Sequence, residues 1–136
     1  TKRKCFKMSD KVKNYLSVAF FAFFGGISRY YLGKIWQSSG TIVVNLAGCF
    51  LLAFLTYYVI ERDLLAGWLN VGLGTGFIGA FTTFSSFTVD FMKLVNAHHL
   101  IHAMVYLSIS ILGGFLCVTL GYILASRLVK KEKGEF

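Results

Sequence analysis

The residues best suited to chemistry lie in one short string, Thr82-Thr83-Phe84-Ser85-Ser86-Phe87. Phe84 and Phe87 stand three residues apart, so on a helix they share a face with hydroxyl groups beside them. The edge of an aromatic ring is partly positive and a hydroxyl group donates hydrogen bonds, so both can attract a small anion. Two phenylalanines at this spacing, among fourteen in the chain, are also typical of ordinary helix packing. The neighbouring hydroxyls favour an anion path.

Other polar residues lie inside apolar stretches. Lipid solvates an amide poorly, so Asn45 must face a partner or water: it either bonds another helix or donates into an ion pathway. Tyr106 and Ser110 share a helical face, although the serine hydroxyl can instead bond the carbonyl four residues earlier. Arg29 either reaches the membrane interface or draws anions toward a vestibule. Asp90 is the only carboxylate inside an apolar stretch.

Enzymes and nucleic-acid-binding proteins are poor matches to this sequence. It offers no acidic pair, no Ser-His-Asp set and no phosphate-binding loop, so we expect no catalysis. His98, His99 and His102 lack a neighbouring carboxylate or cysteine, which argues against a metal site there. The net charge of +8 sits next to hydrophobic segments, and this is typical of anchoring to an anionic membrane leaflet rather than of binding nucleic acid.

Four apolar stretches must position these side chains. A bilayer core about 30 Å thick needs roughly 20 residues of helix, and the chain offers stretches at about 15–35, 40–60, 64–92 and 100–126. Short links separate them, at Gln37-Ser38-Ser39, Glu61-Arg62-Asp63 and Asn96 to His99. The sequence therefore predicts one all-α membrane domain over 15–127, between a basic N-terminal segment (1–14) and a basic C-terminal tail (128–136).

Charge predicts the orientation of the four spans. Eleven of the fourteen Lys and Arg residues lie in the terminal clusters or at Arg62, on the side of the termini. Only Arg29, Lys34 and Lys93 lie on the opposite side. By the positive-inside rule both termini face the cytoplasm.

The third span contains the string Gly72-Leu73-Gly74-Thr75-Gly76-Phe77-Ile78-Gly79-Ala80, followed by two threonines. Each glycine costs a helix interior about 1 kcal/mol relative to alanine, and hydroxyls can take over backbone hydrogen bonds. Small residues at this spacing predict close helix packing. They also fit a helix broken near its middle whose freed carbonyls bind a cation. The two interpretations are compatible.

Three motifs together resemble the Fluc (CrcB) family of fluoride channels. They are Gly25-Gly26-x-x-Arg29-Tyr30, Gly40-Thr41-x-x-x-Asn45-x-x-Gly48 and, most specifically, Gly76-x-x-Gly79-x-x-Thr82-Thr83-Phe84-Ser85-Ser86-Phe87. The likeness covers residues 15 to 127. Ala80 replaces a common family glycine, and Asp90 stands where the family commonly has a glutamate, which shortens the side chain that reaches toward the pore end.

The resemblance implies passive efflux of fluoride across the cell membrane of a prokaryote. Two chains would pack as an antiparallel, dual-topology dimer with a structural sodium ion at its centre, bound by the carbonyls of Gly79 and Thr82. The ion pathway would contain Asn45, Phe84, Phe87, Ser86, Tyr106 and Ser110. Possible vestibule or structural roles fall to Arg29, Thr41 and Asp90.

The partner in this dimer is either a second copy or an inversely oriented paralogue. Because the charge bias is eleven to three, we expect the paralogue. Two rivals to the channel remain, a small multidrug transporter of dual topology and a non-transporting scaffold subunit. The transporter needs a carboxylate in its first span, and residues 15–35 contain none.

Overall fold

The computed structural model describes the backbone of residues 2–133 and the side chains of residues 9–36 and 39–132. Every regular element in this part of the chain is helical, as predicted. In chain order the elements are α1 (Lys2–Phe54), the π-helix η1 (Leu55–Ile60), α2 (Gly67–Val71), the π-helix η2 (Gly72–Ile78), α3 (Gly79–Phe81), α4 (Phe84–Asn96) and α5 (Leu100–Lys133).

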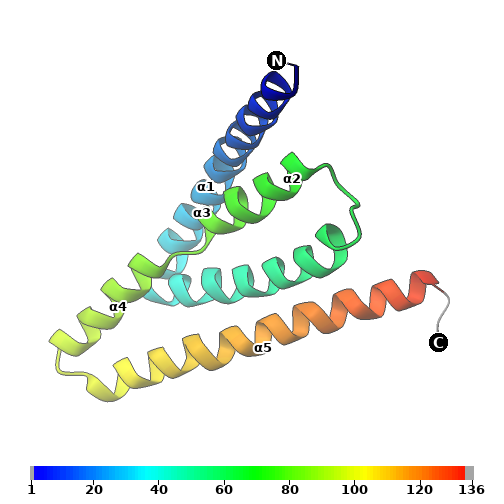
Figure 1. Cartoon of the computed structure of the whole chain (residues 1–136). Coiled ribbons are helices and arrows are strands. Elements are labelled where there is room, and N and C mark those ends of the chain that lie inside the picture. The colour runs from blue at the N-terminus through cyan, green and yellow to red at the C-terminus, as the bar shows by residue number, and fades with distance from the viewer. Residues whose placement is uncertain (1, 134–136) are drawn as a thin grey trace.

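Helix α1 runs through the expected first link without a helical break, and it bends sharply there instead (Figure 1). A Cβ atom on Gly40 would lie only 2.9 Å from the carbonyl oxygen of Leu32. Eight residues of straight helix span about 12 Å, so the chain must fold back on itself. The expected loop stays helical because no proline interrupts it, and Gly40, which lacks a Cβ, permits the close approach to Leu32. We call residues 2–36 the first limb of α1 and residues 39–54 its second limb.

The two later turns lie close to their expected places. Helix α2 begins at Gly67 rather than at 64, after a turn that contains Asp63 at a φ of 51°. The turn between α4 and α5 contains His98 at a φ of 59° and ends before Leu100. Helix α5 then continues to Lys133, so the basic tail is helical as far as that residue.

Because His98 lies in a turn, it does not share a helical face with His102. This residue lies off the helix that carries His102, whereas the rings of His99 and His102 are 5.5 Å apart. Among the described residues, no group of three or more His, Cys, Asp or Glu side chains is placed to hold a metal ion.

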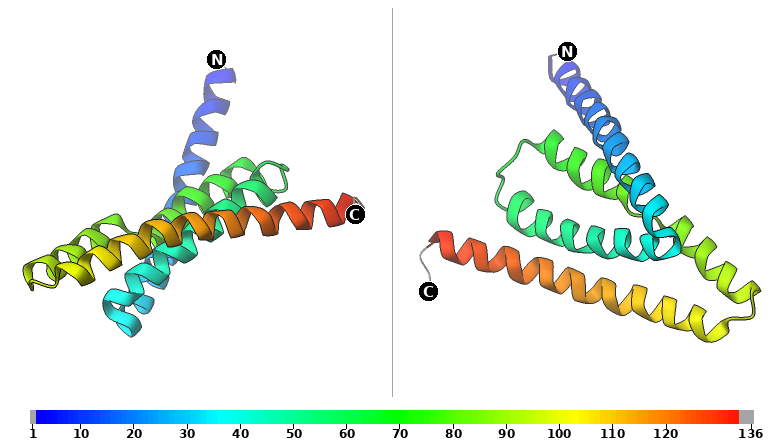
Figure 2. Two further views of the ribbon diagram at one scale, coloured as in Figure 1. Left: turned by 90° about the horizontal axis from the view of Figure 1, so that it is seen from below. Right: turned by 180° about the vertical axis from the view of Figure 1, so that it is seen from behind.

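Glycines allow the helices to pack closely. Helix α5 lies along α4 and along the second limb of α1 (Figure 2). A Cβ on Gly121 would lie 2.5 Å from the carbonyl oxygen of Phe50, so only glycine fits there. Similarly, a Cβ on Gly76 in η2 would lie 2.7 Å from the carbonyl oxygen of Val18 on the first limb. The close-packing interpretation of the glycine-rich string is therefore correct.

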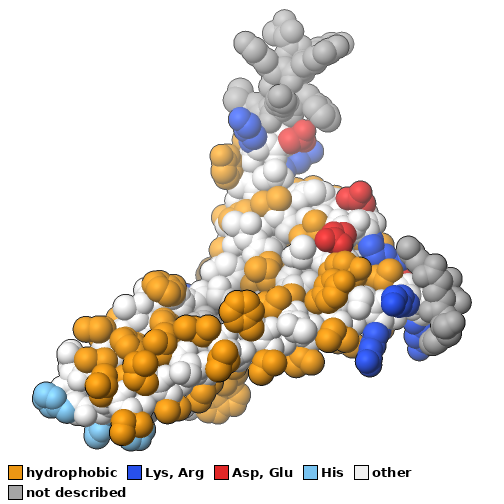
Figure 3. Space-filling model, turned by 60° about the horizontal axis from the view of Figure 1, so that its bottom comes forward, with side chains coloured by type: hydrophobic (Ala, Val, Ile, Leu, Met, Phe, Trp, Pro, Cys, Tyr) orange, Lys and Arg blue, Asp and Glu red, His pale blue; other side chains and the backbone are white. Residues whose placement is uncertain are grey.

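Most apolar side chains face outward. Only six hydrophobic residues are buried within the described part of the chain, namely Val44, Ile78, Phe81, Ala103, Tyr106 and Ala125. Hydrophobic side chains cover the body of the molecule between an end with Lys, Arg, Asp and Glu and an end with histidines (Figure 3). Exposing so large an apolar surface to water is unfavourable, whereas lipid and partner helices would cover it.

Two helical stretches in the described residues are long and apolar enough to cross a membrane. They are Ser39–Ile60, with a mean hydropathy of 2.0, and Leu100–Glu132, with a mean hydropathy of 2.1. These correspond to the second and fourth predicted spans. The third predicted span is divided among shorter helices because it is interrupted at Thr82 and Thr83, and that interruption forms the candidate site.

Candidate functional site

The interruption falls at the threonine pair and not at the glycines before it. The glycine-rich string stays helical through Phe81, and then Thr82 (φ −76°, ψ 154°) and Thr83 (φ −150°, ψ 116°) are extended. The hydroxyl of Thr83 accepts a hydrogen bond from the backbone N–H of Ser86 at 3.2 Å, which caps the start of α4. The threonines therefore end one helix and begin the next.

Asn45, on the second limb of α1, stabilises this interruption through two hydrogen bonds to the backbone of Thr83. Its Nδ2 donates to the carbonyl oxygen of Thr83 at 3.0 Å, and its Oδ1 accepts from the Thr83 N–H at 2.8 Å. The amide oxygen thus gives the Thr83 N–H the acceptor that the Gly79 carbonyl would be in a continuous helix, and the amide N–H adds a donor to the Thr83 carbonyl. Of the two roles open to Asn45 from sequence, the structure shows the hydrogen bond between helices, and its partner is backbone.

These bonds change the surroundings of two carbonyl groups. In a continuous helix the Thr83 N–H would donate to the carbonyl of Gly79, and the Ser86 N–H would donate to the carbonyl of Thr82. Both N–H groups are used elsewhere, one by Asn45 and the other by the Thr83 hydroxyl. The carbonyls of Gly79 and Thr82 have therefore lost their usual helical donors.

A hollow of about 340 Å³ lies at the interruption, between the second limb of α1 and the segment from Gly74 to Phe84. Asn45, Gly79 and Thr82 are among the residues that line it. Gly79 is exposed and the side chain of Phe84 is 81% exposed. The site consequently lies on the surface of a single chain.

The aromatic residues form a short series from α4 to α5. The ring centroids of Phe84 and Phe87 are 5.8 Å apart, and Phe87 stacks on Tyr106 at 5.3 Å. The hydroxyl of Tyr106 is buried and has no hydrogen-bond partner in the described part of the chain. Ser110 donates to the carbonyl of Tyr106 at 2.8 Å, so its hydroxyl bonds back to its own helix. Phe84, Phe87 and Tyr106 thus lie in series, whereas the Ser86 hydroxyl accepts a hydrogen bond from the Thr83 hydroxyl at 3.1 Å.

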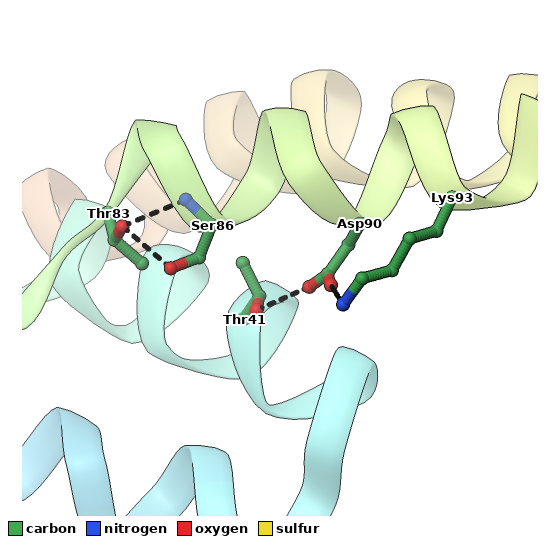
Figure 4. Close-up of polar contacts among 5 residues, drawn as sticks. All are labelled: Thr41, Thr83, Ser86, Asp90 and Lys93. Atoms are coloured by element: carbon green, nitrogen blue, oxygen red, sulfur yellow. Dashed lines mark hydrogen bonds and ion pairs between the residues drawn. The ribbon is translucent and has the colours of Figure 1, made fainter.

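A second polar cluster lies farther along α4 (Figure 4). The Thr41 hydroxyl donates to Oδ2 of Asp90 at 2.8 Å, and Nζ of Lys93 lies 3.5 Å from the other carboxylate oxygen. Asp90 is buried, with 9% of its surface exposed. Its short side chain therefore still reaches a partner on the second limb of α1, and a lysine offsets its charge.

Basic residues gather beside this cluster. Two adjoining hollows, of about 570 and 410 Å³, share Gly33, Thr41 and Ser86. Lys93 lines the first hollow, and Arg29 and Lys34 line the second. These are the three Lys and Arg residues that sequence places opposite the termini, and the fold brings them to one polar region. Arg29 is half-buried there.

A family model described as CrcB-like protein, Camphor Resistance (CrcB), matches residues 16–122. This chain belongs to the CrcB family. The match extends over all of the residues that form the interruption, the aromatic series and the polar cluster. The family resemblance expected from the three motifs is confirmed.

Curated relatives agree with the CrcB assignment. The chain is 54% identical over 107 residues to "Fluoride-specific ion channel FluC 1" of Lactobacillus delbrueckii subsp. bulgaricus, covering 79% of this chain and 84% of the relative. It is 48% identical to the FluC 1 channel of Lactobacillus johnsonii, covering 91% and 96% of the two chains. It is 53% identical to "Fluoride-specific ion channel FluC 2" of Ligilactobacillus salivarius, covering 88% and 91%.

Some residues of this CrcB site were missed by sequence reasoning. Thr83 was noted only as part of the motif, although its backbone and its hydroxyl both organise the interruption. The pairing of Lys93 with Asp90 could have been found from their spacing of three residues on a helix. The position of Arg29 and Lys34 beside Thr41 gave no such signal, because it depends on the bend in α1.

Proposed function

We propose that the chain is one half of a fluoride-selective channel that allows passive efflux of fluoride from the cytoplasm. The observation that carries this proposal is its identity of about half, over most of the chain, to relatives named as fluoride-specific ion channels. The membrane-type helices and the uncharged donors at the interruption fit the same function. As a channel, the chain performs no catalysis.

The chemistry of the site suits a small, strongly hydrated anion. Passage requires donors that replace water at each step without binding the ion too tightly. Asn45 uses one N–H for Thr83, and its amide group has a second N–H to offer. The ring edges of Phe84 and Phe87 and the hydroxyls of Ser86 and Tyr106 would continue the pathway in the dimer, and Ser110 would join them when its hydroxyl turns away from the Tyr106 carbonyl. These roles are predictions for the assembled channel.

A structural sodium ion would be held by the carbonyls of Gly79 and Thr82. These two carbonyl groups suit sodium because both have lost their helical hydrogen-bond donors. Hard cations such as sodium prefer oxygen ligands. Two chains in an antiparallel pair would each contribute both oxygens. Replacing sodium by N-methyl-D-glucamine in the assay described below should then slow fluoride release, whereas an unchanged rate would contradict a role for the ion.

A second chain is needed to enclose the ion pathway. Gly79 and Phe84 are exposed in the single chain, at the place where ion ligands and ring edges should be enclosed. The charge bias favours an inversely oriented paralogue as the partner in the cell membrane. Fluoride conduction by an antiparallel homodimer of this chain, purified alone, would overturn that choice of partner.

The test of function uses an orientation-balanced preparation. The chain is co-expressed with a copy in which all terminal Lys and Arg residues are changed to Gln, which leaves Arg62 alone against three basic residues on the opposite side. Purified protein is reconstituted into liposomes loaded with fluoride or chloride, and release is followed with ion-selective electrodes. We expect release of fluoride and retention of chloride.

Matched variants test whether fluoride release depends on the candidate site. Phe84→Ile removes a ring edge and should slow fluoride release at least tenfold. Phe115→Ile, on α5, makes the same change at a side chain that is 72% exposed, and should leave the rate within twofold. A multidrug transporter or a scaffold would release no fluoride in any of these preparations. Equal rates in the two variants would show that the ring at position 84 does not contact the ion.

A further inference from the structure

An apolar groove lies beside the N-terminal end of the third span, and none of the residues that line it lines the hollow at the ion site. It has a volume of about 620 Å³ and runs between the first limb of α1 and α2. Its apolar wall includes Leu16, Phe20, Phe21 and Trp68, and Lys13 lies at its N-terminal end. The ion site, in contrast, involves the second limb, α4 and α5. The groove therefore needs its own explanation.

The floor of this groove is fixed by two contacts. The hydroxyl of Ser17 donates to the carbonyl of Trp68 at 2.7 Å, which joins the first limb to α2. Gly72 packs against Ser17 and Phe21 so closely that a Cβ atom would clash with both. The wall residues, however, still offer surface to the outside, since Leu16 is 66%, Phe20 60% and Trp68 44% exposed. The groove is thus a shaped apolar surface with a cation at one end.

The position of the groove in the membrane follows from charge. Lys13 belongs to the N-terminal basic cluster, which the positive-inside rule places at the cytoplasmic leaflet. Trp68 follows the turn on the same side of the membrane as both termini, and tryptophan is enriched at membrane interfaces. The apolar wall thus begins at the headgroup level and continues toward the bilayer centre.

We propose that the groove binds one anionic phospholipid of the cytoplasmic leaflet. An acyl chain lies along Leu16, Phe20 and Trp68, and the phosphate pairs with the ammonium group of Lys13. Charge complementarity favours this occupant, because a lysine beside an anionic membrane surface attracts acidic lipid and repels the cationic part of a zwitterionic headgroup. The inference depends on membrane insertion and not on which ion the protein conducts.

The test measures which lipid contacts Trp68. The chain has two tryptophans, so Trp36→Phe leaves Trp68 as the only indole emitter. Protein is reconstituted into bilayers that contain acyl-brominated phosphatidylglycerol or acyl-brominated phosphatidylcholine, and quenching is recorded against lipid mole fraction. We expect about a fivefold preference for the anionic lipid, the ratio that one lysine near a charged surface provides.

Two lysine variants separate a specific site from general surface charge. Lys13→Gln should reduce the preference to about one. Lys11→Gln removes the same charge from the same segment, but Lys11 lies about 200° around the helix from Lys13 and does not line the groove, so the preference should persist.

Three results would overturn the proposal. Equal quenching by the two brominated lipids would show that the groove has no headgroup selectivity. Equal loss of preference in the two lysine variants would assign the effect to the whole basic segment. Absence of quenching by either lipid would show that a protein chain, and not lipid, covers Trp68.

Discussion

Replacing Asn45 by leucine tests the hydrogen bonds that hold the helix interruption open. Leucine is similar in size but makes neither bond to the Thr83 peptide, whose two distances are 2.8 and 3.0 Å. Thr83 is 8% exposed, so water cannot replace the partner of its N–H. An unsatisfied buried group costs about 1–3 kcal/mol, and a side-chain bond within a membrane contributes about 0.6–1.7 kcal/mol. The sum predicts a loss of about 2–5 kcal/mol for Asn45→Leu.

The free energy of unfolding is measured by titrating SDS into mixed micelles, in parallel with fluoride release. Asn45→Asp is the informative companion, because a carboxylate still accepts from the Thr83 N–H but cannot donate to its carbonyl. Stability should therefore fall in the order wild type, Asn45→Asp, Asn45→Leu, and both variants should lose fluoride release. Asn70→Asp, at an amide that donates only to the nearby Leu65 carbonyl, should change stability by less than about 0.5 kcal/mol. If Asn45→Leu proves as stable as the wild type, these two hydrogen bonds do not stabilise the interruption.

Two other predictions concern the start of α4 and the packing of η2 against the first limb of α1. Thr83→Val removes the hydroxyl that caps α4 and should lower the free energy of unfolding by about 1 kcal/mol. The Thr88 hydroxyl bonds its own helix, so Thr88→Val should be neutral and serves as the control. SDS titration compares the two variants, and equal stabilities would contradict the capping role. Gly76→Val brings a Cβ within 2.7 Å of the Val18 carbonyl oxygen and should cost about 1–3 kcal/mol. Gly26→Ala, which meets open space, is its control in the same titration, and a stable Gly76→Val would show that the two helices separate easily.

Local patterns in the sequence predict much of this fold. The spacing of Phe84 and Phe87 places them as neighbours, and their rings are 5.8 Å apart. The apolar stretches at 40–60 and 100–126 are found as helices, and the third stretch is interrupted as its composition suggested. These features depend on residues that are close in sequence, so one chain is enough to reveal them.

Features that depend on distant residues could not be predicted. Asn45 is 38 residues from Thr83, and nothing in its local pattern identifies a backbone peptide as its partner. The bend in α1 was expected as a loop, because the polar residues at 37–39 indicate a turn but do not distinguish a loop from a bent helix. Arg29 and Lys34 reach the vicinity of Thr41 only through that bend.

The position of the helix interruption was predicted only in part. The glycines and the threonine pair together made an interruption of the third span expected, yet the glycine-rich stretch itself remains helical because it packs against the first limb. The break comes at Thr82 and Thr83, where hydroxyl and amide groups can satisfy an extended backbone. Packing therefore outweighs the low helix propensity of glycine, and the available hydrogen-bond partners decide where the helix ends.

The most direct test of the central claim is the initial rate of anion release from liposomes that hold the chain in both orientations. We expect that fluoride leaves rapidly, that chloride stays inside, and that Asn45→Asp and Phe84→Ile each remove most of the fluoride signal. Vesicles that retain fluoride, or that release chloride equally fast, would contradict it.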